Sequence, residues 1–178
     1  MEYGYICFAY SKNEWIAKAI AWFTKSKWSH TFITIPPILG NEMALEAASV
    51  GTCPVLFDKG YRNNPDQIYE VYRVKIPQEK IDNAIVASLG RLQTPYGYLE
   101  YPWFVWRYIN AWLGRDIRSQ DNWSKRNLVC AGLSDFFLDD CGLSSLSDSY
   151  GYNSISAQDI YEIVKAHPEL FELVEKKD

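Results

Sequence analysis

The segment 67–76 constrains the fold most, because its side chains alternate between two faces as they do in a β-strand. One face carries Tyr69, Val71, Arg73 and Lys75, and the other carries Ile68, Glu70, Tyr72, Val74 and Ile76. Runs of aromatic and β-branched residues predict three earlier strands, over residues 3–9, 28–35 and 43–49. An antiparallel sheet is the simplest arrangement of these strands.

A first helix is expected over residues 14–25, between the first two strands. Ser11 and Glu14 have the Ser-x-x-Glu spacing of a capping box at its start. Its apolar side chains recur at helical spacing, which predicts a broad buried face made by Trp15, Ile16, Ala19, Ile20, Trp22 and Phe23.

Helical patterns dominate the chain after residue 76. Pro77 opens a helix that ends before Thr94 and Pro95, and three more are expected over residues 103–113, 127–141 and 157–174. We expect the last of these to break near His167 and Pro168, and the polar segment 114–126 to form a surface loop. These elements together predict an α+β fold with helices packed on an antiparallel sheet.

The size and charge of the chain narrow the classes of protein it can belong to. Its 178 residues, 48% of them hydrophobic, fit a single domain over residues 1–178. A net charge of −4 argues against nucleic acid as a partner. The start of the chain has no signal-peptide pattern, so we expect a cytoplasmic protein, or a virion-associated one if it is phage-encoded. The oligomeric state is left open.

The longest apolar run, residues 103–113, is too short to cross a bilayer, which takes roughly 20 apolar residues. We therefore expect no transmembrane segment. The stripe of Trp103, Trp106, Ile109 and Leu113 is more typical of a core or a groove wall than of a membrane anchor. Its aromatic density also suits a lipid-like ligand, and peripheral membrane contact stays open.

The four cysteines, Cys7, Cys53, Cys130 and Cys141, show neither a CxxC pair nor the spacing of a zinc site. Reduced thiols are therefore expected, with no metal and no cofactor. Cys130 falls at the expected start of a helix, where the unpaired backbone N–H groups and the helix dipole favour a thiolate. The alternative is a small buried apolar residue, the commoner role of a free cysteine. We expect that role for Cys7 and Cys141.

A catalytic thiolate needs an imidazole beside it and a polar group that orients the imidazole. The chain has two histidines, and His30 is preferred because it lies on an expected strand between Trp28 and Phe32. His167 is the rival base, in a charged segment where an exposed histidine is ordinary. Glu46 is the preferred orienting group, and Glu42 or an amide or backbone oxygen is the alternative.

Two motifs resemble the NlpC/P60 cysteine peptidases. They are Thr94-Pro95-Tyr96-Gly97-Tyr98 and, further along, Val129-Cys130-Ala131-Gly132-Leu133. In that family the histidine strand follows the cysteine helix, whereas here the matching strand with His30 comes first. The order resembles the circularly permuted branch, the YiiX/YaeF-like papain-fold hydrolases, which are related to lecithin:retinol acyltransferase-like enzymes. The likeness covers about residues 3–141. Val129, Ala131 and Gly97 depart from the residues common in the family.

The resemblance implies a papain-like fold with Cys130 as nucleophile, His30 as base and acid, Glu46 as orienting group and Tyr96 beside the oxyanion. It implies a bacterial or phage cysteine hydrolase that cleaves an amide or ester bond through a thioacyl intermediate. The substrate would be a cell-wall peptide of peptidoglycan, or an N-acyl, lipid-like molecule. The alternatives are an acyltransferase that uses the same thioester and a non-catalytic binding or virion protein that keeps the fold.

Overall fold

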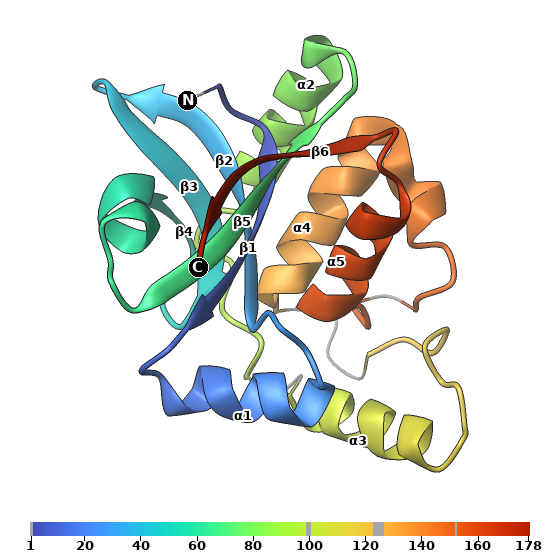
Figure 1. The fold of residues 1–178 in the computed structure, drawn as a ribbon. Coiled ribbons are helices and arrows are strands. Elements are labelled where there is room, and N and C mark those ends of the chain that lie inside the picture. Colours follow the sequence, from blue (N-terminus) through green and yellow to red (C-terminus); the bar gives the residue numbers. More distant parts are fainter. Residues whose placement is uncertain (1, 99–100, 123–126, 152) are drawn as a thin grey trace.

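The protein is built on a six-stranded sheet in the order β4-β3-β2-β1-β5-β6, with every neighbouring pair antiparallel (Figure 1). The computed structural model describes residues 2–98, 101–122, 127–151 and 153–178, and leaves the side chains of residues 16, 20, 23, 24 and 101 undescribed. The strands are β1 (Tyr5–Ser11), β2 (His30–Ile38), β3 (Asn41–Ala48), β4 (Gly51–Leu56), β5 (Gln67–Val74) and β6 (Phe171–Lys177).

The helical elements lie on both faces and at one end of this sheet. The α-helices are α1 (Trp15–Thr24), α2 (Gln78–Leu89), α3 (Tyr101–Trp112), α4 (Cys130–Leu138) and α5 (Ala157–Ala166). Short turns of other helix types are η1 (Asp58–Arg62), η3 (Asp139–Leu143) and η4 (Ser144–Leu146). This arrangement confirms the predicted α+β class.

The central strand β1 is buried on both faces because each face has its own core. Ile6 and Phe8 point into the larger core, which α2, α4 and α5 cover. Tyr5 and Cys7 point into the smaller core on the opposite face, which is closed by η1 through Phe57 and Tyr61. Figure 1 shows η1 on one side of the sheet and α2, α4 and α5 on the other, with α1 and α3 together at one end.

Two strands were not expected from the sequence. The last helix was expected over residues 157–174 with a break near His167 and Pro168; α5 does end at Ala166, but the residues after the break form the strand Phe171–Lys177, which pairs with β5. Pro168 cannot continue the α5 hydrogen bonds, and the free edge of β5 offers the following residues a strand partner. β4 was missed because it contains Pro54, which is tolerated here on an edge strand.

The α1 helix departs from its expected packing. Ser11 belongs to β1, and the N-cap of α1 is Glu14, whose side chain makes no capping hydrogen bond, so the predicted capping box is wrong. Trp15 and Trp22 are 75% and 76% exposed, and Ala19 is exposed as well. The side chains of Ile16, Ile20 and Phe23 lie outside the described set. α1 covers the end of the sheet rather than a face, so these tryptophans have no core to enter.

The α3 helix is also only partly buried. Trp103 is in the core, whereas Trp106, Ile109 and Leu113 of the same predicted stripe are exposed. No helix in the described part of the chain is both long and apolar enough to span a membrane.

Candidate active site

His30 and Glu46 form a direct contact at the start of the second strand. His30 is the first residue of β2, and its Nε2 lies 3.1 Å from the Glu46 Oε2 on β3. Ile33 faces Leu45 in the β2–β3 pair, and this register places Glu46 opposite Phe32. Since alternate residues share a face, His30 and Glu46 project from the same side of the sheet. Nδ1 is then the ring nitrogen available for another partner.

Cys130 is the first residue of α4, in agreement with its expected place at a helix start. Its N-cap, Val129, has extended backbone angles and supplies no side-chain cap. The unpaired N–H groups of this turn therefore face the thiol region, where they favour negative charge. Cys130 itself is buried, with 7% of its surface exposed.

The structure brings Cys130 and His30 together although a hundred residues separate them in the sequence. Burial raises the pKa of the Cys130 thiol, but the hydrogen bond and charge of His30 outweigh it and hold that pKa below its ordinary value. The backbone N–H groups of Thr31 and Ala131 lower it further. The site therefore favours a thiolate.

The same contacts favour a protonated imidazole. Burial lowers the pKa of His30, but the Cys130 thiolate and then the Glu46 carboxylate raise it well above its ordinary value. Burial raises the pKa of Glu46, and hydrogen bonds from His30 and Tyr61 more than reverse this, so Glu46 stays ionised. These shifts favour the form in which a Cys130 thiolate pairs with a His30 imidazolium, with the Glu46 carboxylate on the other side of the ring.

Tyr61 belongs to this site and was not predicted from the sequence. Its hydroxyl donates a very short hydrogen bond to the Glu46 Oε2. Its ring stacks on Phe32 with centroids 4.1 Å apart, and Phe32 in turn stacks on the His30 ring at 5.9 Å. Tyr61 lies in η1, which is distant in sequence from the motifs at residues 94–98 and 129–133. Its side chain reaches Glu46 because η1 packs against the face of the sheet that carries Glu46.

A second link joins β2 to α4 beside the cysteine. The Thr31 hydroxyl donates to the Cys7 carbonyl at 2.8 Å and lies 3.0 Å from the Ser134 hydroxyl, with both side chains buried. Ser134 is one turn along α4 from Cys130. This contact fixes the spacing between the strand that carries His30 and the helix that carries the thiol.

Tyr96 lies beside the start of the cysteine helix through its backbone. It forms a parallel bridge with Leu128, and the Gly97 N–H donates to the Leu128 carbonyl at 3.1 Å. The Leu128 N–H donates to the Pro95 carbonyl at 3.1 Å. The ring is half-buried and lies edge-on to Tyr98, with centroids 5.1 Å apart.

The rival base His167 and the alternative orienting group Glu42 have other partners. His167 is the C-cap of α5, and its Nδ1 lies 2.9 Å from the Glu169 Oε1. Glu42 accepts a hydrogen bond at 2.7 Å from Arg62, so its carboxylate is engaged away from His30. Burial and Asp140 raise the pKa of Cys141 to about 12.

The other two thiols are not activated either. Burial places the pKa of Cys7 well above its ordinary value. Cys53 pairs across β4 and β3 with Glu46, and burial together with that carboxylate raises its pKa. Among the four cysteines, Cys130 is the one whose pKa is lowered.

No protein-family model matches this sequence, and no curated protein matches it either. Among solved structures, the chain is similar to the crystal structure of the metalloprotein YiiX from Escherichia coli O157:H7, a DUF1105 protein. The sequence identity is 16% and the TM-score is 0.64, and the match covers 99% of this chain and 97% of YiiX. The likeness shows a common fold over the whole chain, in agreement with the expected YiiX-like, papain-like architecture.

The side chains of this site do not fit a metal ion. Among the residues that the structure describes, no group of three or more His, Cys, Asp or Glu side chains could hold a metal. The candidate site has these residue types, but His30 lies between Cys130 and Glu46 and interacts with each of them. A metal site instead needs donor atoms that converge on one point.

Proposed function

We propose that the protein is a cysteine hydrolase that cleaves an amide or ester bond through a thioester on Cys130. The observation that carries this proposal is the row of Glu46, His30 and Cys130, in which the thiol pKa is lowered and the imidazole pKa is raised. A thiolate that is paired with an imidazolium is both a nucleophile and a proton source, which acyl transfer requires.

In the proposed reaction the Cys130 thiolate adds to the carbonyl carbon of the substrate, and the carbonyl oxygen becomes an oxyanion. The backbone N–H groups at the start of α4 and the neighbouring Tyr96 stabilise this charge. The intermediate then collapses, the bond to the leaving nitrogen or oxygen breaks, and the leaving group takes the proton of the His30 imidazolium. Cys130 is left as a thioester.

Water completes the cycle. His30, now neutral, accepts a proton from a water molecule that attacks the thioester carbonyl, and the carbon–sulfur bond breaks. The products are a carboxylic acid and the restored thiolate–imidazolium pair. Glu46 and Tyr61 are positioning residues in this scheme, because they hold the imidazole and touch no reacting atom.

The experiment that tests this function is mass spectrometry of the protein after brief incubation with peptidoglycan fragments or with N-acyl lipids. We expect one of the two substrate classes to leave an acyl group on Cys130, and the Cys130→Ala variant to acquire none. Cys53→Ala is the matched control and is expected to be acylated like the wild type. Acylation of Cys53 instead, or of no cysteine with either class, would refute the proposal in favour of a non-catalytic binding protein.

The fate of the acyl group separates a hydrolase from an acyltransferase. When an alcohol or amine acceptor is added, a hydrolase still releases mainly the free acid, whereas a transferase yields mainly the acyl-acceptor product. We expect the free acid.

A further inference from the structure

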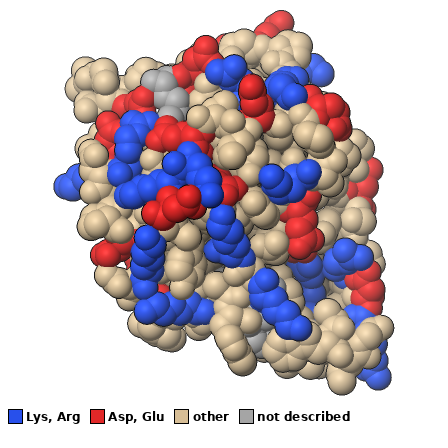
Figure 2. All heavy atoms as spheres, viewed as in Figure 1, with Lys and Arg blue, Asp and Glu red and all other residues tan. Residues whose placement is uncertain are grey.

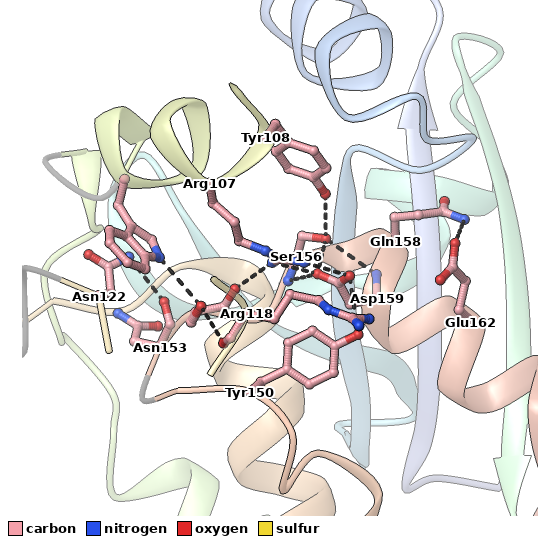
Figure 3. Close-up of polar contacts among 12 residues, drawn as sticks. Arg107, Tyr108, Arg118, Asn122, Tyr150, Asn153, Ser156, Gln158, Asp159 and Glu162 are labelled. Atoms are coloured by element: carbon pink, nitrogen blue, oxygen red, sulfur yellow. Dashed lines mark hydrogen bonds and ion pairs between the residues drawn. The ribbon is translucent and has the colours of Figure 1, made fainter. Parts of the chain in front are cut away.

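The α3 helix carries buried polar side chains next to the buried Trp103 on its inner side, and apolar side chains on its outer side. Arg107 and Asn110 are buried on its inner side. The Arg107 guanidinium binds both carboxylate oxygens of Asp159 at 2.8 Å and donates to the Ser154 carbonyl at 2.6 Å. Figure 3 shows Arg107 reaching from α3 into this polar cluster on the segment that leads into α5. The pairing fixes which side of α3 faces solvent.

The outer side of α3 is apolar and exposed. Its residues recur at spacings of one, three and four, which puts them on one face of the helix. Their exposed fractions are Val105 42%, Trp106 46%, Ile109 37%, Trp112 50% and Leu113 67%.

The α1 helix adds tryptophan and lysine in alternation to the same end of the molecule. Trp15, Lys18, Trp22 and Lys25 follow one another at spacings of three and four, and all four are exposed. The Lys25 Nζ lies 6.0 Å from the centre of the Trp112 ring, which joins the two helices. We call these four residues and the outer residues of α3 the tryptophan–lysine face.

The tryptophan–lysine face carries two lysines and is flanked by one exposed acidic residue at the start of α1, Glu14, although the whole chain has a net charge of −4. Neither α1 nor α3 contains an acidic residue. Glu14 and Glu100 precede the two helices in sequence, and Asp116 beyond α3 is ion-paired with Arg118 at 2.7 Å. Figure 2, in the view of Figure 1, shows uncharged side chains over much of the end that α1 and α3 form, with blue Lys and Arg side chains around it and a red acidic group among them at the right-hand edge.

We propose that the tryptophan–lysine face docks on the surface of an anionic phospholipid bilayer. Tryptophan is suited to the boundary between headgroups and acyl chains, since its ring is apolar and its N–H is polar. Lysine extends its charge to the headgroups while its stem stays on apolar surface. Two helices lying flat with such faces match interfacial helices, which bind without spanning the membrane.

A second copy of this chain fits the face less well. In a two-fold symmetric dimer the same patch meets itself, which would bring the four lysines Lys18 and Lys25 of both copies together against only the two Glu14 side chains at the ends of α1. An anionic bilayer supplies the missing negative charge. The inference goes beyond the proposed function, because it concerns where the protein binds and does not depend on Cys130 chemistry.

The test is flotation of the full chain with vesicles of phosphatidylcholine alone, or of equal parts phosphatidylcholine and phosphatidylglycerol. We expect the wild type to float with the anionic vesicles and to bind neutral ones at least about tenfold more weakly. Lys18→Glu/Lys25→Glu and Trp22→Ser/Trp112→Ser are each expected to reduce binding about tenfold or more. Cys130→Ala is expected to float like the wild type, so failure of the catalytic proposal leaves this result unchanged.

Matched controls keep the test specific. Lys59→Glu/Lys80→Glu changes the net charge equally on another surface, and Leu39→Ser removes an apolar side chain that is 96% exposed on the β2–β3 turn. Both controls are expected to float like the wild type, and circular dichroism checks that every variant is folded. The proposal is overturned if the wild type binds neither vesicle, or if the controls lose as much binding as the face variants. It is also overturned if sedimentation shows a dimer that Trp22→Ser/Trp112→Ser dissociates while vesicle binding is retained.

Discussion

Tyr61 and His30 contact the same carboxylate oxygen, Oε2 of Glu46. The phenol and the imidazole approach it from different elements, η1 and β2, and the Phe32 ring packs against both of their rings. Glu46 is thereby held on two sides, and its carboxylate cannot swing away from His30 without losing the Tyr61 hydrogen bond.

Tyr61→Phe should destabilise the fold while leaving the ring stacking intact. The change removes a buried hydrogen bond to a charged group, which is worth about 1–2 kcal/mol in free energy of unfolding. Urea denaturation measures the loss. Tyr98→Phe is the matched control, because its hydroxyl makes an exposed 3.4 Å contact to the Ser49 carbonyl, and it should cost much less. Equal losses in the two variants would mean that the Tyr61 hydroxyl does not support Glu46.

Glu46→Gln should lower the pKa of His30, because the Glu46 carboxylate is one of the groups that raise it. The chain has two histidines, so His30 and His167 can be followed separately by NMR titration. Glu42→Gln is the control, since Glu42 pairs with Arg62. If Glu42→Gln moved the His30 titration and Glu46→Gln did not, the assignment of the third residue would be wrong.

Cys130 should be the first cysteine to react with iodoacetamide near neutral pH. Its pKa is lowered by His30, whereas the pKa of the more exposed Cys53 is raised by burial and by Glu46. Peptide mapping after a short reaction measures the labelling of each thiol. Faster labelling of Cys53 would show that exposure, rather than thiolate formation, governs reactivity here.

Arg107→Leu should destabilise the protein by about 3 kcal/mol, because it leaves the buried Asp159 carboxylate without its ion-pair partner. Arg118→Leu breaks a half-exposed pair with Asp116 and should cost less than about 1 kcal/mol. Unfolding curves in urea compare the two. Similar small losses would indicate that the inward orientation of α3 does not depend on Arg107.

The sequence predicted those helices and strands in which the spacing of apolar residues matches the spacing of the residues that are buried. β5 was found because its side chains alternate between the two cores, and α2 was found because its apolar side chains recur at helical spacing on the face that meets the larger core. β6 was missed because its strand state depends on the free edge of β5, which the local sequence does not show. The exposed tryptophans of α1 were placed inside because an apolar stripe ordinarily faces a core.

The residues of the candidate site were likewise predicted only in part. Cys130, His30 and Glu46 were chosen by residue type and by the order of short motifs, and the structure places His30 between the other two. Tyr61 could not be chosen, because its contact with Glu46 depends on how η1 folds under the sheet. The backbone of Tyr96 lies beside Leu128 at the start of the cysteine helix, and its role at the oxyanion stays a prediction.

The pH dependence of Cys130 alkylation tests the thiolate–imidazolium pair most directly. In the wild type the rate should begin to fall at a lower pH than in a variant without the imidazole, because His30 lowers the Cys130 pKa below its ordinary value of 9.0. In His30→Ala the rate should instead fall about tenfold per pH unit below about pH 9, as for an unassisted thiol. His167→Ala should follow the wild type. If wild type and His30→Ala gave the same profile, Cys130 would not be activated by His30, and the proposed hydrolase mechanism would be wrong.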